Sequence, residues 1–126
     1  NVRALGSSGE FVEWLRHGLD SGEIPVNQPD ARVHLIAGYA FLRVPDVFYL
    51  YLKQPGSNHG RRYVQSVFER AGLHRVRSGE RFVQARLYDS AERKGRYQPV
   101  SGYLVKSRSL FSGKGLPGDS PFITFP

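Results

Sequence analysis

Few side chains in this chain of 126 residues have the types and spacing that catalysis requires. The four histidines, His17, His34, His59 and His74, lie far apart, and no two have the spacing of zinc ligands on one helix. The motif Gly-x-Ser-x-Gly is missing, and a chain without cysteine has neither a thiol nucleophile nor a cysteine-based metal site. We therefore predict no catalytic residue, no metal site and no cofactor.

Basic residues are concentrated in one part of the chain. Residues 58–114 hold 13 Lys or Arg and 4 Asp or Glu, whereas residues 1–57 hold 5 and 6, and residues 115–126 hold 0 and 1. Arg makes up 14 of the 18 basic residues, and its planar guanidinium binds phosphate bidentately and stacks on rings. This pattern predicts an anionic partner, most simply nucleic acid; the alternative is a solvated face that only keeps the domain in solution.

Three helices are expected to position these residues. The first covers residues 8–20, and the second is short and begins at Pro45, since proline is tolerated in the first turn. The third runs from Asn58, a suitable N-cap, to Ala71, and Gly72 follows where a left-handed residue is favoured.

The third helix is amphipathic. One arc of about 140° holds its apolar residues at 100° per residue and should face the core: Tyr63, Val64, Val67, Phe68 and Ala71. The polar residues that remain are placed on its outer surface or flanks: Arg61, Arg62, Gln65, Ser66 and Arg70. Arg and Gln form bidentate hydrogen bonds with guanine or adenine edges, so this surface is a candidate for DNA contact. Against this, Glu69 in the same helix would repel phosphate.

The strands are predicted from β-branched and aromatic runs. Residues 32–44 fit a hairpin turning near Gly38, and the competing interpretation is one buried helix, which Gly38 and the β-branched content disfavour. Further strands are expected at residues 73–76, 81–88 and 100–106, with a polar loop at residues 89–99.

The order of these elements predicts an α+β, winged-helix-like domain over residues 1–109, with three helices, β-hairpins and a basic wing, followed by an irregular tail at residues 110–126. In a winged helix, the third helix enters the major groove and the wing contacts the backbone or minor groove. Three basic residues lie on the predicted wing: Arg93, Lys94 and Arg96.

One strand has a second possible use. Phe82, Gln84, Arg86 and Tyr88 alternate along it and share one face, an interleaving of aromatic and cationic groups typical of single-strand binders. The same spacing is found in any sheet covered by a helix, and for Phe82 and Tyr88 we favour cover or a domain interface.

Several segments of the chain resemble the C-terminal domain of TraI-like relaxases of the MobH class, the nickase/helicases of integrating conjugative elements. The resemblance spans roughly residues 9–110, and its most distinctive segments are Asn-Gln-Pro-Asp-Ala-Arg-Val-His at 27–34 and Val-Pro-x-x-Phe at 44–48. It implies a cytoplasmic bacterial domain with a winged-helix-like fold, in a protein whose metal-dependent chemistry lies elsewhere. No catalytic residue carries over. We interpret Asn27 as a turn residue and His34 as a buried or edge histidine that finds a partner, which is commoner than a metal ligand.

The function predicted from the sequence is that of a non-catalytic accessory domain that binds DNA through the third helix and wing. The alternative is a module that docks onto the relaxase, a partner or a second copy through Phe122, Ile123 and Phe125. No apolar stretch is long enough to span a membrane, and the absence of Met suggests a piece of a larger protein.

Overall fold

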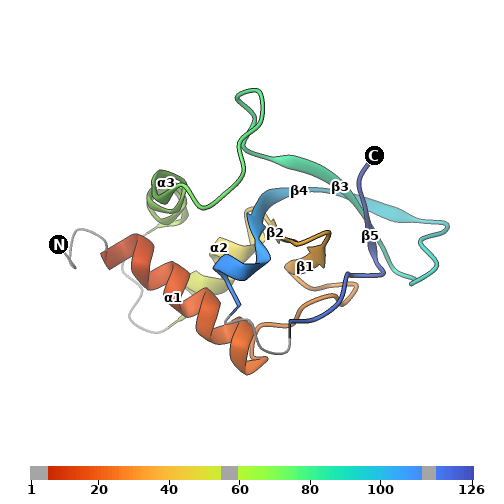
Figure 1. The fold of residues 1–126 in the computed structure, drawn as a ribbon, viewed down its shortest axis with the longest axis horizontal. Coiled ribbons are helices and arrows are strands. Elements are labelled where there is room, and N and C mark those ends of the chain that lie inside the picture. Colours follow the sequence, from red (N-terminus) through yellow and green to blue (C-terminus); the bar gives the residue numbers. More distant parts are fainter. Residues whose placement is uncertain (1–5, 55–59, 112–115) are drawn as a thin grey trace.

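The fold is described by a computed structural model that covers residues 6–54, 60–111 and 116–126 (Figure 1). In chain order its elements are α1 (Gly6–Ser21), β1 (Val33–Ile36), β2 (Tyr39–Arg43), α2 (Asp46–Leu52), α3 (Arg61–Ala71), β3 (Val83–Tyr88), β4 (Tyr97–Lys106), the 3-10 turn η1 (Ser107–Ser109) and β5 (Ile123–Thr124). No helix in these ranges is long and apolar enough to cross a membrane.

The helices form where the apolar spacing predicts them. α2 begins directly after Pro45, and α3 ends at Gly72, whose φ of 77° is the left-handed conformation that glycine adopts without a steric cost. Gly60 is the N-cap of α3, while the predicted start, Asn58, lies outside the described residues. The predicted hairpin is also confirmed: β1 and β2 pair antiparallel on either side of a turn at Ala37 and Gly38.

The winged-helix prediction is wrong, although the α+β class holds. β4 is ten residues long and pairs with β2 over residues 102–106 and with β3 over residues 97–102. It therefore joins the two predicted hairpins into one curled antiparallel sheet with the order β1-β2-β4-β3-β5, instead of leaving a small hairpin beside a helical bundle. At residues 73–76, only a bridge from His74 to Val105 is found in place of the predicted strand.

Gly102 lies where β4 changes partners. Its register partners are Arg43 on one side and Val83 on the other. A Cβ at this position would lie 2.3 Å from the carbonyl oxygen of Leu42, so only glycine lets β2 and β4 approach this closely.

The two faces of the sheet carry separate apolar cores. The helices pack on one face, where Phe11 of α1, Phe48 of α2 and Phe68 of α3 meet around Tyr103 of β4. The opposite face has a smaller core: Phe41, Ala85, Leu87, Val100, Leu104 and Ile123.

Residues 118–124 cross from β1, one edge strand of the sheet, to β3, where β5 forms the other edge strand. The Ser120 amide donates to Leu35 in β1, and Ile123 pairs with Leu87 in β3. The interpretation of His34 is confirmed, since this buried ring lies 2.8 Å from the Ser120 hydroxyl and 3.1 Å from the Ala31 carbonyl. These contacts tie residues 118–124 to both ends of the sheet.

Asn27 has the expected turn conformation, with a positive φ of 61°. Its side chain bonds to both neighbouring segments. The amide nitrogen donates to the Gly118 carbonyl, and its oxygen accepts a hydrogen bond from the Leu35 amide. Asn27 therefore holds residue 118 beside β1.

Candidate nucleic-acid interface

The eight side chains predicted to contact DNA differ in their access to solvent. Six are exposed: Arg62, Ser66 and Arg70 on α3, and Arg93, Lys94 and Arg96 in the loop between β3 and β4. Arg61 is half-buried, and Gln65 is buried, with 8% of its surface exposed. The structure therefore places Gln65 inside the domain and not on the outer surface of α3.

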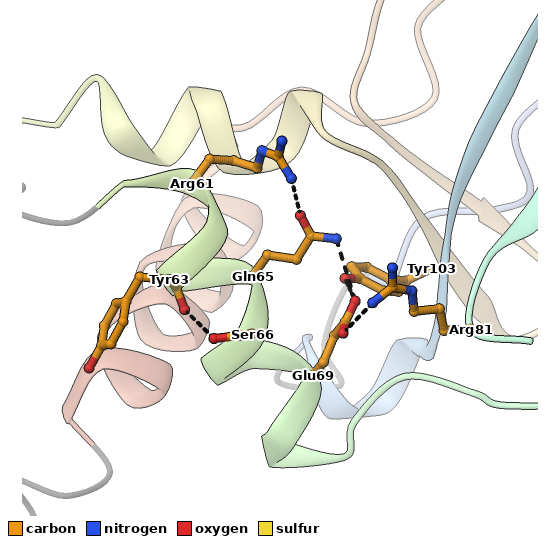
Figure 2. A network of polar contacts seen from close by, with 7 residues as sticks. All are labelled: Arg61, Tyr63, Gln65, Ser66, Glu69, Arg81 and Tyr103. Carbon is orange, nitrogen blue, oxygen red and sulfur yellow. Dashed lines mark hydrogen bonds and ion pairs between the residues drawn. The ribbon is translucent and has the colours of Figure 1, made fainter. Parts of the chain in front are cut away.

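Gln65 belongs to a chain of hydrogen bonds that links α3 to the sheet (Figure 2). Arg61 donates from Nη1 to Gln65 Oε1 at 2.8 Å, and Gln65 Nε2 donates to Glu69 Oε2 at 3.4 Å. Glu69 also accepts from Arg81 Nη1 at 2.7 Å and from the Tyr103 hydroxyl at 2.5 Å. We call these five residues the α3 network, and its bonds direct the polar atoms of Arg61 and Gln65 inward.

The charge of Glu69 is balanced within this network. Burial is the largest single influence on its pKa and acts to raise it, but the hydrogen bonds from Tyr103, Arg81 and Gln65 together lower the pKa below its usual 4.5. Glu69 is therefore a carboxylate at neutral pH, and it is paired with the Arg81 guanidinium. Its repulsion of phosphate is weaker than the sequence suggested.

Two further groups of this region stay uncharged at neutral pH. Burial, reinforced by the hydrogen bond to Glu69, raises the pKa of Tyr103, which remains a protonated donor. Burial also lowers the pKa of His74, whose ring packs 5.0 Å from that of Tyr103. The charged groups that act on the Tyr103 hydroxyl are Glu69 and Arg81.

The face of β3 and β4 on which the helices pack extends beyond α3, and part of that extension is exposed. Gln84 is exposed and accepts a 3.0 Å hydrogen bond from the Ser101 hydroxyl. The Arg86 guanidinium lies 4.8 Å from the ring centre of Tyr97, and 46% of the Tyr97 surface is exposed. We call this surface the exposed strip: the exposed residues Arg81, Gln84, Tyr97 and Pro99 together with the half-buried residues Arg86 and Ser101.

The two aromatic residues predicted to share this face are covered. Phe82 is half-buried against Tyr103, with ring centres 5.3 Å apart, and Tyr88 is buried against Tyr97. This agrees with the interpretation that other parts of the domain cover these two rings. The exposed ring of the strip is Tyr97 on β4, a residue to which the sequence analysis gave no role.

The helix and the loop do not form one surface. In Figure 1, α3 lies at one end of the molecule and the loop between β3 and β4 lies at the other. The exposed strip lies between them, because Arg81 bonds to Glu69 of α3 at its start and β3 leads into the loop at its end.

Arg81, Tyr97 and Tyr103 are missing from the predicted site. Tyr103 is 34 positions from Glu69 and Arg81 is 12 positions away, so no helical or strand period connects them to it. The one sequence signal was the alternation of aromatic and polar residues along the strand that begins near Arg81. It indicated which side chains share a face of that strand, but not that this face contacts α3.

The apolar residues suggested as an alternative docking surface lie mainly inside the chain. Ile123 is fully buried, and Phe122 packs against the smaller core. Phe125 is 39% exposed, and its ring centre lies 6.3 Å from that of Phe41. Within the described residues, no group of three His, Asp or Glu side chains could hold a metal ion.

Two of three comparisons with known proteins found a match. The family model described as "Putative conjugal transfer nickase/helicase TraI C-term" matches residues 6–125. A crystal structure of the C-terminal domain of a Salmonella enterica protein is similar in sequence and fold: it is 42% identical, with a TM-score of 0.86 over 95% of this chain and 96% of that one. A search of curated proteins found no match.

Proposed function

We propose that this chain, which belongs to the family of C-terminal domains of the conjugal transfer nickase/helicase TraI, is a non-catalytic accessory domain that holds DNA for the rest of that protein. Its contact surface would run from α3 along the exposed strip to the loop at residues 89–96. The observation that supports this proposal is the row of basic side chains along this surface: Arg62, Arg70, Arg81, Arg86, Arg93, Lys94 and Arg96.

The chemistry of this surface favours phosphate contact over base reading. Arg and Lys side chains at phosphates position a protein on DNA without reading its sequence. Gln65, the predicted partner for an adenine edge, is bonded to Arg61 and Glu69 inside the domain. We therefore expect binding with a steep salt dependence and little sequence preference.

The spacing of the charges favours a long contact. α3 and the loop lie at opposite ends of the molecule, so DNA that reached both would run along β3 and past Tyr97. An exposed ring beside a guanidinium offers a stacking site to an unpaired base, so a single strand is the form that we expect to bind more tightly.

The proposal is tested by the affinity for a labelled single strand and a duplex of equal length, measured by anisotropy at several salt concentrations. The variants are Arg93→Ala/Lys94→Ala/Arg96→Ala in the loop and Arg62→Ala/Arg70→Ala on α3. Each lost phosphate contact should reduce the salt slope by about 0.7 for a single strand. Lys53→Ala, at the exposed C-cap of α2 and outside the proposed surface, is the control with a lost positive charge.

Wild-type affinity and slope in both variants would refute the proposed surface. No DNA binding by the wild-type chain, together with a concentration-dependent dimer in sedimentation, would favour the protein-docking alternative.

A further inference from the structure

We infer that the domain has a second polynucleotide site, a groove on the opposite face of the sheet around Tyr39, Arg75 and Lys106, and that this groove binds single-stranded DNA. The inference does not depend on the proposed strip, because none of the strip residues lines the groove.

The groove consists of three adjoining hollows. The first, about 350 Å³, and the second, about 330 Å³, share Tyr39 and Lys106 in their walls. The third, about 300 Å³, shares Arg75 with the second. Each hollow therefore shares a basic side chain with the next: Lys106 between the first and second, and Arg75 between the second and third.

Strand pairing brings these distant residues together. Tyr39 in β2 is the register partner of Lys106 in β4, so the two side chains lie on the same face of the sheet. The Arg75 amide donates to the Leu104 carbonyl at 2.7 Å, which holds the segment after α3 against β4. Tyr103, which contacts α3, alternates with Leu104 and faces the other way.

The groove is basic. Arg77, Lys106 and Arg108 are exposed, and Arg75 is half-buried. Glu80 is the acidic residue in the walls of these hollows. Asp119 also lies near the first hollow, where its carboxylate accepts a hydrogen bond from the Ala37 amide beside Gly38. Four basic groups against these two acids favour an anionic ligand with several charges.

Aromatic groups distinguish the ligand further. The Arg75 guanidinium lies 5.6 Å from the ring centre of Tyr39, whereas Phe82 in the wall of the third hollow packs against Tyr103 and is not counted as a stacking site. A planar guanidinium and a ring stack on an unpaired base while neighbouring cations bind its phosphates, and a duplex keeps its bases stacked inside. An acidic peptide would satisfy the charges but would leave the stacking surface unused.

The site is tested with labelled oligo-dT and a duplex of equal length, using the full chain. Arg75→Ala/Lys106→Ala should weaken oligo-dT binding at least about tenfold and lower its salt slope, because two phosphate contacts are removed. Duplex binding should weaken much less, because a duplex offers the groove no unpaired base. Tyr39→Leu, which keeps an apolar side chain at the edge of the smaller core, should weaken oligo-dT binding between about fivefold and a hundredfold.

A further double variant and a crosslinking experiment distinguish loss of the site from misfolding. Lys106→Ala/Arg108→Ala changes only exposed side chains and should weaken oligo-dT binding about tenfold with an unchanged melting temperature. Photo-crosslinking of DNA single strands that carry bromodeoxyuridine should label Tyr39, as identified by mass spectrometry.

Three results would overturn the inference: wild-type oligo-dT affinity in the groove variants, crosslinks confined to other residues, or displacement of oligo-dT by poly-glutamate as effective as displacement by unlabelled oligo-dT. If Arg93→Ala/Lys94→Ala/Arg96→Ala in the loop lost binding while the groove variants kept wild-type affinity, the proposed function would stand and this second site would be excluded.

Discussion

The α3 network and the loop at residues 89–96 both hold basic side chains, but they use them differently. In the network, Arg61, Gln65 and Arg81 are bonded to each other or to Glu69, and the bonds connect α3 to β4 and to the segment before β3. In the loop, Arg93, Lys94 and Arg96 are exposed. The same residue type therefore contributes to stability in one region and is available to a ligand in the other.

This difference makes the two regions separable by mutation. A buried polar group that loses its partner costs free energy, whereas an exposed side chain in a loop has water as a replacement. Substitutions on the inner side of α3 should act on unfolding, and substitutions in the loop should act on DNA binding. The following experiments test this separation.

The largest effect is expected from the apolar side of α3. Phe68 is fully buried and contacts Phe11, Phe48 and Tyr103, so Phe68→Ala should lower the free energy of unfolding by about 3–5 kcal/mol. Urea denaturation followed by the fluorescence of the single tryptophan measures this value. A loss below about 1 kcal/mol would show that α3 is not held by this contact.

Next comes the network itself. Glu69→Ala should cost about 2–3 kcal/mol, because Tyr103, Gln65 and Arg81 all lose their acceptor. The matched control is Glu92→Ala, which removes an exposed carboxylate from the loop and should change the free energy of unfolding by less than about 0.5 kcal/mol. Equal losses in the two variants would contradict the distinction between the regions.

Lowering the pH should also show that Glu69 contributes to stability, with a smaller effect on the free energy of unfolding. The pKa of Glu69 is lower in the folded chain than its usual 4.5, so its contribution to stability is present above pH 4.5 and is lost as the pH falls through the folded value. Glu69→Gln should therefore lose less stability than the wild type below pH 4.5. Urea midpoints at pH 6, 4.5 and 3 provide the comparison, and parallel curves would exclude this role for Glu69.

His34 must be allowed for in that experiment. Burial, the main cause, lowers its pKa to about 4 from 6.5, so unfolding takes up a proton and stability falls as the pH drops from 6.5 toward 4. This loss is common to the wild type and Glu69→Gln, and it cancels in the difference between them.

The smallest effect on stability concerns the loop backbone. Arg93 has a φ of 56°, a conformation that favours glycine, so Arg93→Gly should raise the free energy of unfolding by up to about 1 kcal/mol or leave it unchanged. It should still reduce the salt slope of single-strand binding by about 0.7. Arg96→Ala removes the same charge and should give the loss of slope without the gain in stability.

Local spacing predicted what depends on neighbours in the chain. The burial of Val64 and Phe68, the left-handed Gly72 and the turn at Gly38 all follow from short-range signals. Tyr63, placed in the same apolar arc, is 46% exposed, because the core contacts a narrower face of α3 than the arc covers.

The partners of these elements were not predictable in the same way. The winged-helix expectation treated the strands as separate hairpins, whereas β4 pairs with β2 and β3 at different points along its length. Helical spacing placed Gln65 on the outer surface of α3, and its burial depends on Tyr103 of β4 and on Arg81, just before β3, which bond to the same carboxylate. The basic groove depends in the same way on the register of Tyr39 with Lys106.

The attachment of residues 118–124 to both ends of the sheet has a consequence for biosynthesis. His34 and Ser120, which bond to each other, are 86 positions apart, so β1 leaves the ribosome long before its partner does. Until then the smaller core lacks Ile123, and the nascent domain exposes Phe41 and Leu87 to other chains. The smaller core can therefore form only after Ile123 has left the ribosome, and a chaperone that shields this face until then would raise the yield of the domain.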